Sequence, residues 1–257
     1  MKAQTRKFEI KFNRAKNRIE RKGLRMFRAM FRQMYKDFLD IATSRPPQMW
    51  LDSVKVNENL VWENFLKFYS LNADLGLMVR ENLVPQKADP DDVMWINIFQ
   101  DKMREIVRNE AGEKIVSIVN TTDEQLKKIV REVLQVGEAE GFGIPQITED
   151  LRRAVGRNLR GNAYARARAI AQTEMISASN RASQEAASST GFRMRKYWST
   201  SGLANVRDSH LQAEADSIDG LEMNEPFSNG LMYPGDPAGP PEEVCNCRCT
   251  VLHEPVR

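Results

Sequence analysis

The sequence is poor in long apolar runs, in cysteine and in histidine, and each shortage excludes a class of protein. No apolar run approaches the roughly 20 residues that a helix needs to cross a bilayer. The first residues, MKAQTRKFEIKFNRAKNR, lack the short apolar core of a secretory signal. We therefore expect a soluble protein that is made inside a cell. All three cysteines lie within residues 245–249, so they cannot form a disulfide framework for the chain and instead indicate reduced thiols or a metal site.

The sequence does contain enough apolar material for a folded core. Its 257 residues, with 41% hydrophobic and 28% charged content, fit one large or two modest domains. The net charge of +3 is unevenly distributed, because residues 1–36 hold 13 Lys and Arg against 2 Asp and Glu, which leaves 25 against 33 for the rest. A basic N-terminal segment on a mildly acidic body indicates contact with nucleic acid or with the negative face of a protein partner.

Apolar residues recur in the first forty residues at spacings of three and four, which places them on one face of a helix. We call this set the apolar stripe, and it consists of Phe8, Phe12, Ala15, Ile19, Met26, Met30, Met34, Phe38 and Ile41. Basic residues fill the other faces, and Gly23 weakens the middle of the helix. Ser44-Arg45-Pro46-Pro47 then ends it. The sequence therefore predicts a long basic helix over residues 1–42.

Further helices are predicted in the middle of the chain. Helical spacing continues through residues 48–84, and Asp89-Pro90-Asp91-Asp92 has the features of another helix start. Thr122-Asp123-Glu124-Gln125 has the form of a capping box, and Gly141 to Pro145 closes the helix that follows it. Thr148 is expected to cap the next helix.

The chain changes character near its end. Residues 192–198 alternate in a strand-like way, and the tail that follows is dense in Gly, Pro, Asn and Asp. The predicted fold class is α+β and mainly helical, with long N-terminal helices followed by a compact C-terminal domain with helices and a small β-sheet. We predict a helical N-terminal region over residues 1–115 and a C-terminal domain over residues 116–257.

An ordered series of short motifs runs through the C-terminal half of the chain. These motifs are Ala169-Ile170-Ala171-Gln172-Thr173-Glu174 with Asn180, Lys196-Tyr197-Trp198, Arg207-Asp208-Ser209-His210, Asp219-Gly220, Phe227, Tyr233-Pro234-Gly235-Asp236-Pro237 and Asn246-Cys247-Arg248-Cys249. In order and spacing the series resembles the phage Mu F-like family of minor head proteins of tailed bacteriophages, over about residues 122–251. Each motif alone is weak, but the combination that ends in Pro-Gly-Asp-Pro and Asn-Cys-Arg-Cys is fairly specific.

The resemblance implies a minor capsid protein that associates with the portal during procapsid assembly and serves head morphogenesis, DNA packaging or ejection. It implies a location in the phage head, in its interior or at the portal vertex, with the portal protein or the major capsid protein as partners. It does not cover the N-terminal half. Three positions depart from the family pattern, with Gln172 where arginine is frequent, Asn205 where an acidic residue is frequent, and Cys245 as an extra thiol.

Two motifs of the C-terminal half offer ligands for a metal ion. His210, Cys245, Cys247 and Cys249 provide the nitrogen and sulfur atoms that suit Zn²⁺. Asp208 and His253 are other candidates for a fourth ligand. The alternative is that the cysteines pack as small hydrophobic residues while His210 forms hydrogen bonds in a loop. We predict no catalytic residues and no cofactor other than a structural zinc ion, because the chain has only two histidines and no nucleophile motif. The competing hypotheses are a metal-dependent enzyme that acts on nucleic acid and a free DNA-binding protein that does not depend on sequence.

Two other features have structural interpretations. Pro234-Gly235-Asp236-Pro237 is expected to form a rigid turn, in which Gly235 adopts a backbone angle that other residues avoid and Asp236 accepts from nearby amides. Glu174 lies on a predicted helix beside Arg166, Arg168 and Arg181. It is expected to form a buried ion pair that fixes this helix against the strand unit rather than to act as a catalytic acid.

The N-terminal helix has two candidate binding modes. Its apolar stripe could dock on the body of the protein or on a portal, and its basic faces could neutralise DNA phosphates. We call the second set the basic row, and it consists of Lys7, Lys11, Arg14, Arg18, Arg21, Arg25, Arg28 and Arg32. No ladder of aromatic residues is evident for stacking on bases, so any binding to double-stranded DNA should be independent of sequence and sensitive to salt.

Overall fold

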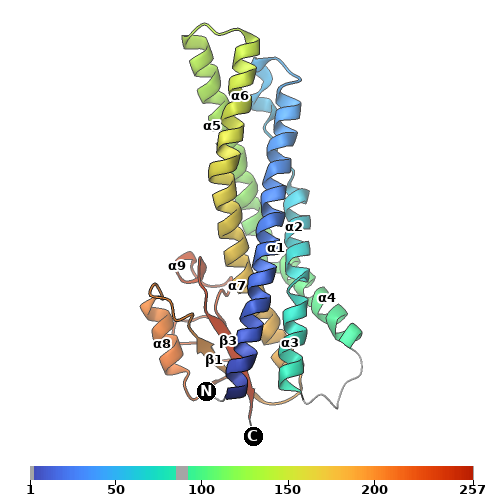
Figure 1. Ribbon diagram of the computed structural model, residues 1–257, viewed down its shortest axis with the longest axis vertical. Coiled ribbons are helices and arrows are strands. Elements are labelled where there is room, and N and C mark those ends of the chain that lie inside the picture. The colour runs from blue at the N-terminus through green and yellow to red at the C-terminus, as the bar shows by residue number, and fades with distance from the viewer. Residues whose placement is uncertain (1–2, 85–91, 257) are drawn as a thin grey trace. The chain divides into compact units, whose positions relative to one another are not determined.

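The computed structural model of the protein describes residues 3–84 and 92–256, and its elements are mainly helical (Figure 1). The helices are α1 (Ala3–Ala42), α2 (Glu58–Ser70), α3 (Ala73–Leu83), α4 (Asp92–Glu110), α5 (Gly112–Ala139), α6 (Ile144–Asn158), α7 (Tyr164–Ser188), α8 (Asp208–Asp216) and α9 (Pro241–Val244). The strands are β1 (Met194–Ser199), β2 (Leu221–Glu222) and β3 (Thr250–Pro255). The predicted class, mainly helical α+β with a small sheet, is confirmed.

The chain divides into two compact units, each built from several segments. Unit 1 comprises the described parts of Met1–Gly23, Leu66–Arg108 and Ala169–Arg257, and unit 2 comprises Leu24–Phe65 and Asn109–Arg168. The predicted boundary between residues 115 and 116 lies inside α5, and each unit contains chain from both sides of it. Whether residues 116–257 fold as a domain by themselves stays a prediction.

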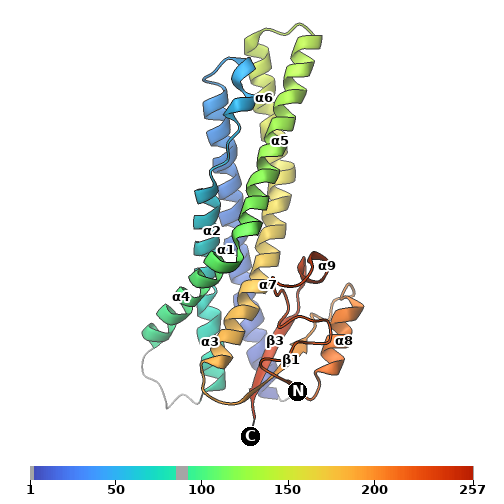
Figure 2. The ribbon, with the colours of Figure 1, turned by 180° about the vertical axis from the view of Figure 1, so that it is seen from behind.

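Unit 1 contains a three-stranded antiparallel sheet of order β2-β1-β3. β1 has the predicted alternation, because Met194, Lys196 and Trp198 are buried while the residues between them are partly exposed. Along β3, His253 pairs with Lys196 and Val251 pairs with Trp198. The views from the two sides show β1 and β3 next to each other with α8 close to the sheet (Figure 2). One face of the sheet is therefore available to line a core.

Unit 2 is helical and includes the hairpin of α5 and α6 (Figure 2). The hairpin turns after Ala139, where Gly141 has a φ of +65°, so the predicted helix end at Gly141 to Pro145 is confirmed. Within this unit Arg166 donates to Thr122 Oγ1 and to Ile118 O, both at 3.1 Å, and its guanidinium lies over the ring of Phe31. These contacts join the beginning of α7 to α5.

Two predicted helix starts are wrong, because Thr122 and Thr148 lie inside α5 and α6. Each hydroxyl donates to the carbonyl oxygen four residues earlier, Thr122 Oγ1 to Ile118 O at 2.7 Å and Thr148 Oγ1 to Ile144 O at 2.8 Å. A threonine can satisfy its hydroxyl within a helix in this way, so its presence does not by itself mark a helix start. The predicted start at residues 89–92 falls largely outside the described residues, which resume at Asp92.

α1 is one continuous helix, as predicted, and Gly23 does not interrupt it. A Cβ at this position would lie 2.1 Å from Phe68 Cε2, so the absence of a side chain lets the buried ring of Phe68 lie against the backbone of α1. Packing against Phe68 within unit 1 therefore explains why position 23 is occupied by glycine, a weak helix former.

We predict that Gly23→Ala destabilises the protein even though alanine favours a helix by about 1 kcal/mol over glycine. The added methyl group must displace Phe68, and overpacking of this kind costs about 1–3 kcal/mol. Chemical denaturation measures the free energy of unfolding. Gly112→Ala is the matched control, since a Cβ there meets nothing within 4 Å, and it should be neutral or stabilising. Equal effects of the two substitutions would contradict this packing.

Candidate metal centre and basic helix face

The site in unit 1 is built on the part of α7 that follows Arg168, which is lined with small residues. Ala171, Ala178, Ala182 and Ala186 are all buried, and their short side chains let other segments approach the helix closely. A Cβ at Gly235 would lie 3.0 Å from the backbone nitrogen of Ser177. The chain from residue 233 to residue 237 therefore lies directly on α7.

Asn180 fastens two of these segments to α7 through its side-chain amide. Its Nδ2 donates to Pro234 O at 2.8 Å and to Cys249 O at 3.2 Å, and its Oδ1 accepts from Val251 N at 3.0 Å. Asn180 is fully buried, so these bonds satisfy backbone groups that water does not reach. One residue thus positions both the turn at Pro234 and the beginning of β3.

The turn at residues 234–237 has the predicted form. Gly235 has a φ of +80°, which residues with a side chain rarely adopt. Asp236 accepts from Met232 N at 2.9 Å and from Ala238 N at 3.0 Å, so its carboxylate satisfies two loop amides. Both roles predicted for this motif are confirmed.

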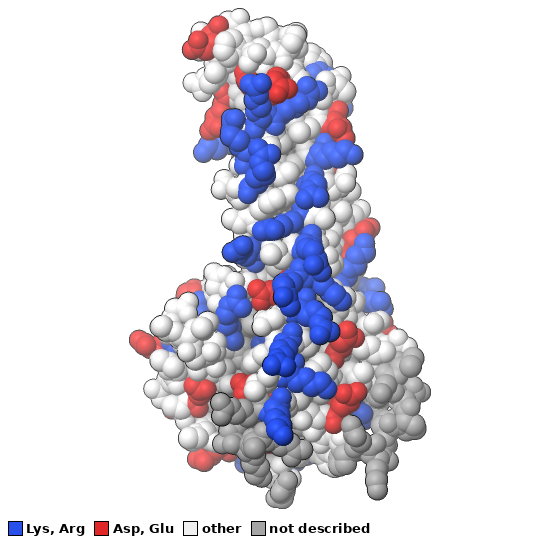
Figure 3. All heavy atoms as spheres, viewed as in Figure 1, with Lys and Arg blue, Asp and Glu red and all other residues white. Residues whose placement is uncertain are grey.

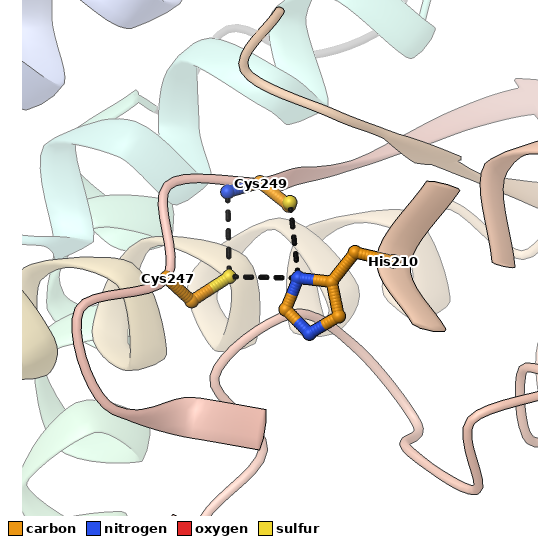
Figure 4. Close-up of side chains that lie close together, drawn as sticks. All are labelled: His210, Cys247 and Cys249. Atoms are coloured by element: carbon orange, nitrogen blue, oxygen red, sulfur yellow. Dashed lines mark hydrogen bonds between the residues drawn. The ribbon is translucent and has the colours of Figure 1, made fainter. Parts of the chain in front are cut away.

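His210 lies in the first turn of α8 and is held from both sides. Its Nε2 is 2.9 Å from Glu243 Oε2 on α9, and its ring packs edge-on against Trp198 with centroids 4.9 Å apart. Glu243 also accepts from Ser209 Oγ at 3.0 Å. The imidazole is thereby fixed with its other nitrogen, Nδ1, directed toward the segment before β3 (Figure 4).

Two thiols converge on that nitrogen. Cys247 Sγ lies 3.7 Å and Cys249 Sγ lies 3.4 Å from His210 Nδ1, and all three ligand atoms lie within 4.8 Å of one another (Figure 4). The backbone N–H of Cys249 also donates to Cys247 Sγ at 3.4 Å. Both cysteines are buried, and the segment that carries them precedes β3 rather than forming part of it. Asn246, just before them, has a φ of +56°, a value that asparagine tolerates better than most residues.

A buried lysine lies close to the thiols. Lys16 of α1 donates through Nζ to Thr250 Oγ1 at 2.8 Å. Burial lowers the pKa of its ammonium group from 10.5 to about 8, while the nearby thiols act in the opposite direction. A hydrogen bond with Cys249 lowers the pKa of Cys247 to about 7, and the same bond raises the pKa of Cys249. Of the two thiols, Cys247 is therefore the one that loses its proton more readily.

The structure assembles three of the four residues predicted as metal ligands. Cys245 is exposed and lies outside the cluster, and its carbonyl oxygen accepts from Arg207 at 2.7 Å. Asp208 is exposed at the start of α8. His253 is buried elsewhere on β3, between Ser183 Oγ and Gln184 Oε1. Burial and Lys196 lower the pKa of His253 to about 3, so its imidazole is neutral.

Sequence reasoning missed Glu243 and Lys16 as neighbours of the cluster. Glu243 lies in the short helix α9, two residues after Pro241, and Lys16 belongs to a helix more than two hundred residues earlier in the chain. For Glu174 the structure shows burial and a hydrogen bond from Tyr69 Oη at 2.6 Å. The ion pair predicted for Glu174 stays a prediction.

The basic row lies on the outer side of α1, and Figure 3 shows lysine and arginine side chains gathered along this helix. In unit 1 its members Lys7, Lys11, Arg14, Arg18 and Arg21 are all exposed. Among the described residues none of these five forms an ion pair. In unit 2, Arg25 and Arg32 are exposed, Arg32 donates to Tyr164 Oη, and Arg28 lies over the ring of Tyr164.

The apolar stripe of α1 is largely buried within the chain. Phe12 and Ile19 are buried in unit 1, and Met30, Met34 and Phe38 are buried in unit 2, whereas Ile41 is exposed. Docking of the stripe on a portal, one of the two modes considered for it, is therefore a poor explanation of the pattern. The stripe is accounted for by packing on the protein's own body.

Fold and site together define a class of protein module in which ordered loops and a small sheet are fastened to one long helix around a buried histidine and thiol cluster. Residues 127–252 match the family model described as Phage Mu protein F like protein, and this part of the chain belongs to that family. Membership suggests a phage head morphogenesis protein with a structural rather than an enzymatic role, and it implies a component of the virion. Comparisons with curated proteins and with solved structures found no match. No helix among the described residues has the length and apolarity needed to cross a membrane.

We predict that Asn180→Ala lowers the free energy of unfolding by about 3 kcal/mol, because it leaves buried backbone groups of residues 234, 249 and 251 without a partner. Asn180→Asp should also destabilise, since it turns a carboxylate oxygen toward two carbonyl oxygens. Chemical denaturation of the reduced protein measures both effects. Asn109→Ala, at an exposed position of α4, is the matched control and should change stability by about 0.5 kcal/mol or less. An Asn180→Ala variant as stable as this control would contradict the assigned role.

Proposed function

We propose that the protein is a minor head protein that acts at or near the portal during head assembly, and that the outer face of α1 contacts packaged double-stranded DNA. The observation that carries the proposal is the row of five exposed cations in unit 1, Lys7 to Arg21, in a chain whose residues 127–252 match a phage head family. The same location would allow a part in DNA packaging or ejection.

The charge of this face supports contact with a polyanion. The two acidic residues among the first 36 are both engaged, Glu20 with Arg248 at 3.4 Å and Glu9 with Ser199 Oγ at 3.4 Å. The row is therefore not neutralised by acids of its own segment. An ordinary solvated helix face mixes lysine with glutamate, as α4 and α5 do in their ion pairs of residues 101–105 and 124–132.

The spacing of the five cations along α1 also favours an extended anionic partner. Steps of four and three residues place the five cations along one face, and Lys7 and Arg21 are separated by about 21 Å at 1.5 Å per residue. Double-stranded DNA presents about one phosphate per 1.7 Å of its axis, so a groove edge of that length offers several phosphates. Such contact neutralises charge without reading bases, which agrees with the expected independence of sequence.

The competing enzyme hypothesis has only the histidine and thiol cluster to support it. His210, Cys247 and Cys249 are each about 2% exposed or less, so no reacting atom of the cluster faces solvent. An assay of nuclease activity with added zinc, comparing wild type with His210→Ala, tests this hypothesis. Turnover that depends on His210 would favour it over the structural role.

Location in the particle is the direct test of the proposed function. We expect cryo-electron microscopy of purified heads, without imposed icosahedral symmetry, to show density for this protein at or next to the portal vertex. Mass spectrometry of the same heads should detect it at low copy number. Particles that lack the protein and still package and eject DNA normally would refute the proposal.

We predict that replacing Lys7, Lys11, Arg14, Arg18 and Arg21 with glutamine weakens DNA binding at low salt. It should also reduce the slope of log K against log salt concentration by about 4 to 5, at about 0.9 for each phosphate that the protein no longer neutralises. Binding measured by fluorescence anisotropy with unrelated DNA duplexes checks both effects and the independence of sequence.

The matched control removes the same charge elsewhere. Lys102, Arg104, Lys127, Lys128 and Arg153 each lie in an ion pair with an acid one helical turn away. Replacing these five with glutamine changes the net charge equally but should leave the salt slope close to that of wild type. Equal reductions of the slope in the two variants would mean that net charge, and not the face of α1, governs binding.

A further inference from the structure

The cluster of His210, Cys247 and Cys249 has the dimensions of a zinc site. In tetrahedral coordination with Zn–N of about 2.0–2.1 Å and Zn–S of about 2.3 Å, a nitrogen and a sulfur ligand lie about 3.6 Å apart. The two distances from His210 Nδ1 to the thiols are 3.7 and 3.4 Å. Both values match that separation, and all three atoms are within 4.8 Å of one another.

We propose that His210 Nδ1 and the thiolates of Cys247 and Cys249 bind one Zn²⁺ ion, and that Glu243 orients the histidine ligand. Cys245 is not a ligand. The three protein atoms leave one tetrahedral position for a ligand that is not a side chain of this set. The inference concerns the C-terminal module itself and does not depend on the contact of α1 with DNA.

The surroundings of the cluster are those of a metal site. A histidine that binds zinc typically uses its other ring nitrogen to donate to a carboxylate, and His210 Nε2 meets Glu243 Oε2 at 2.9 Å. Because Ser209 Oγ also donates to Glu243, the carboxylate is held in place. The bond from Cys249 N–H to Cys247 Sγ gives one thiolate a backbone donor. These contacts fix two of the three ligands before any ion is bound.

The charges of the buried groups balance around a divalent cation. Two thiolates would neutralise the charge of Zn²⁺. Without a cation, a second thiolate in this buried space would be costly, whereas a bound Zn²⁺ would compensate both negative charges. Soft sulfur and nitrogen ligands select zinc over magnesium or calcium, which prefer oxygen.

A bound ion would link two segments that are far apart in the sequence, the first turn of α8 and the segment before β3. His210 lies in the first turn of α8, and the cysteines precede β3, so the ion would close the loop of residues 210–247 against the end of the sheet. The loop contains few regular elements, namely the remainder of α8, the short strand β2 and α9. The site is therefore a structural staple for the loops of the module.

A carboxylate, imidazole and thiol in series could also activate a cysteine nucleophile. Two observations favour the metal. Both thiols approach the same nitrogen, whereas a nucleophile requires only one. Both are also 2% exposed, which leaves a substrate no access to sulfur.

Metal binding by the full chain tests the proposal. Reduced protein, stripped with a chelator and dialysed, should bind one equivalent of Zn²⁺ as measured by mass spectrometry of metals. Co²⁺ in place of zinc should give thiolate-to-cobalt charge-transfer absorption and the intense visible bands of tetrahedral coordination. Wild-type protein that retains no zinc and gives no thiolate-to-cobalt absorption would overturn the proposal without reference to any variant.

Single substitutions then identify the ligands. Cys247→Ser and Cys249→Ser should each lose the tightly bound zinc and the charge-transfer absorption. Cys245→Ser is the matched control, removing the neighbouring exposed thiol, and it should bind zinc as wild type does. If Cys245→Ser loses zinc as the other two do, the assigned ligand set is wrong.

Glu243 is a positioning residue, and its effect is measured on the metal. Glu243→Gln should weaken zinc affinity about 10- to 100-fold, the usual effect of removing such a partner, while the cobalt spectrum keeps its charge-transfer band. Glu242→Gln, at the exposed neighbouring position, is the control and should bind as wild type. Unchanged zinc affinity in Glu243→Gln would remove Glu243 from the proposal.

Discussion

The loops of unit 1 depend on how closely they can approach α7. Alanine and serine on the buried side of this helix allow backbone to lie directly on it, and that closeness brings carbonyl and amide groups into a space without water. The amide of Asn180 satisfies three such groups from two loops. If it were absent, the turn at Pro234 and the beginning of β3 would lose a common point of attachment. The cysteine segment lies between these two points in sequence, so its position follows from the same contact.

Elements whose signal is local could be predicted from the sequence, because the causes lie within a few residues. The three- and four-residue spacing of apolar residues predicted α1, and the alternation of residues 192–198 predicted β1. The backbone preference of Gly235 and the acceptor oxygens of Asp236 predicted the turn at residues 234–237. The wrong prediction of a helix start at Thr122 has a non-local cause. Its hydroxyl can cap a helix or bond within one, and in the structure it bonds within α5 and accepts from Arg166 of α7. No pattern around residue 122 contains that information.

The candidate site shows the same division. His210, Cys247 and Cys249 could be proposed together because their chemistry restricts what they do, and the Cys-Arg-Cys spacing already brings the two thiols close. Only the fold shows that Cys245 is not part of the cluster. In the sequence, three cysteines at alternate positions look equally suited to bind a metal. Glu243 and Lys16 carry side chains common on any surface. Only the packing of α9 and α1 within unit 1 gives them a role, so composition could not have found them.

The N-terminal helix is not a detachable arm, and this affects how its charge should be understood. Phe12, Lys16 and Ile19 are buried in unit 1, and Glu20 holds Arg248 beside the cysteine segment. Deleting the first 36 residues would therefore remove part of the core together with the basic row, and a loss of DNA binding would not separate the two effects. Because α1 uses one side for packing, its opposite side is the only one that can vary freely in charge. This side carries arginine and lysine and almost no acidic residues. Because the side is not used for packing, the stability of the fold does not explain its charge.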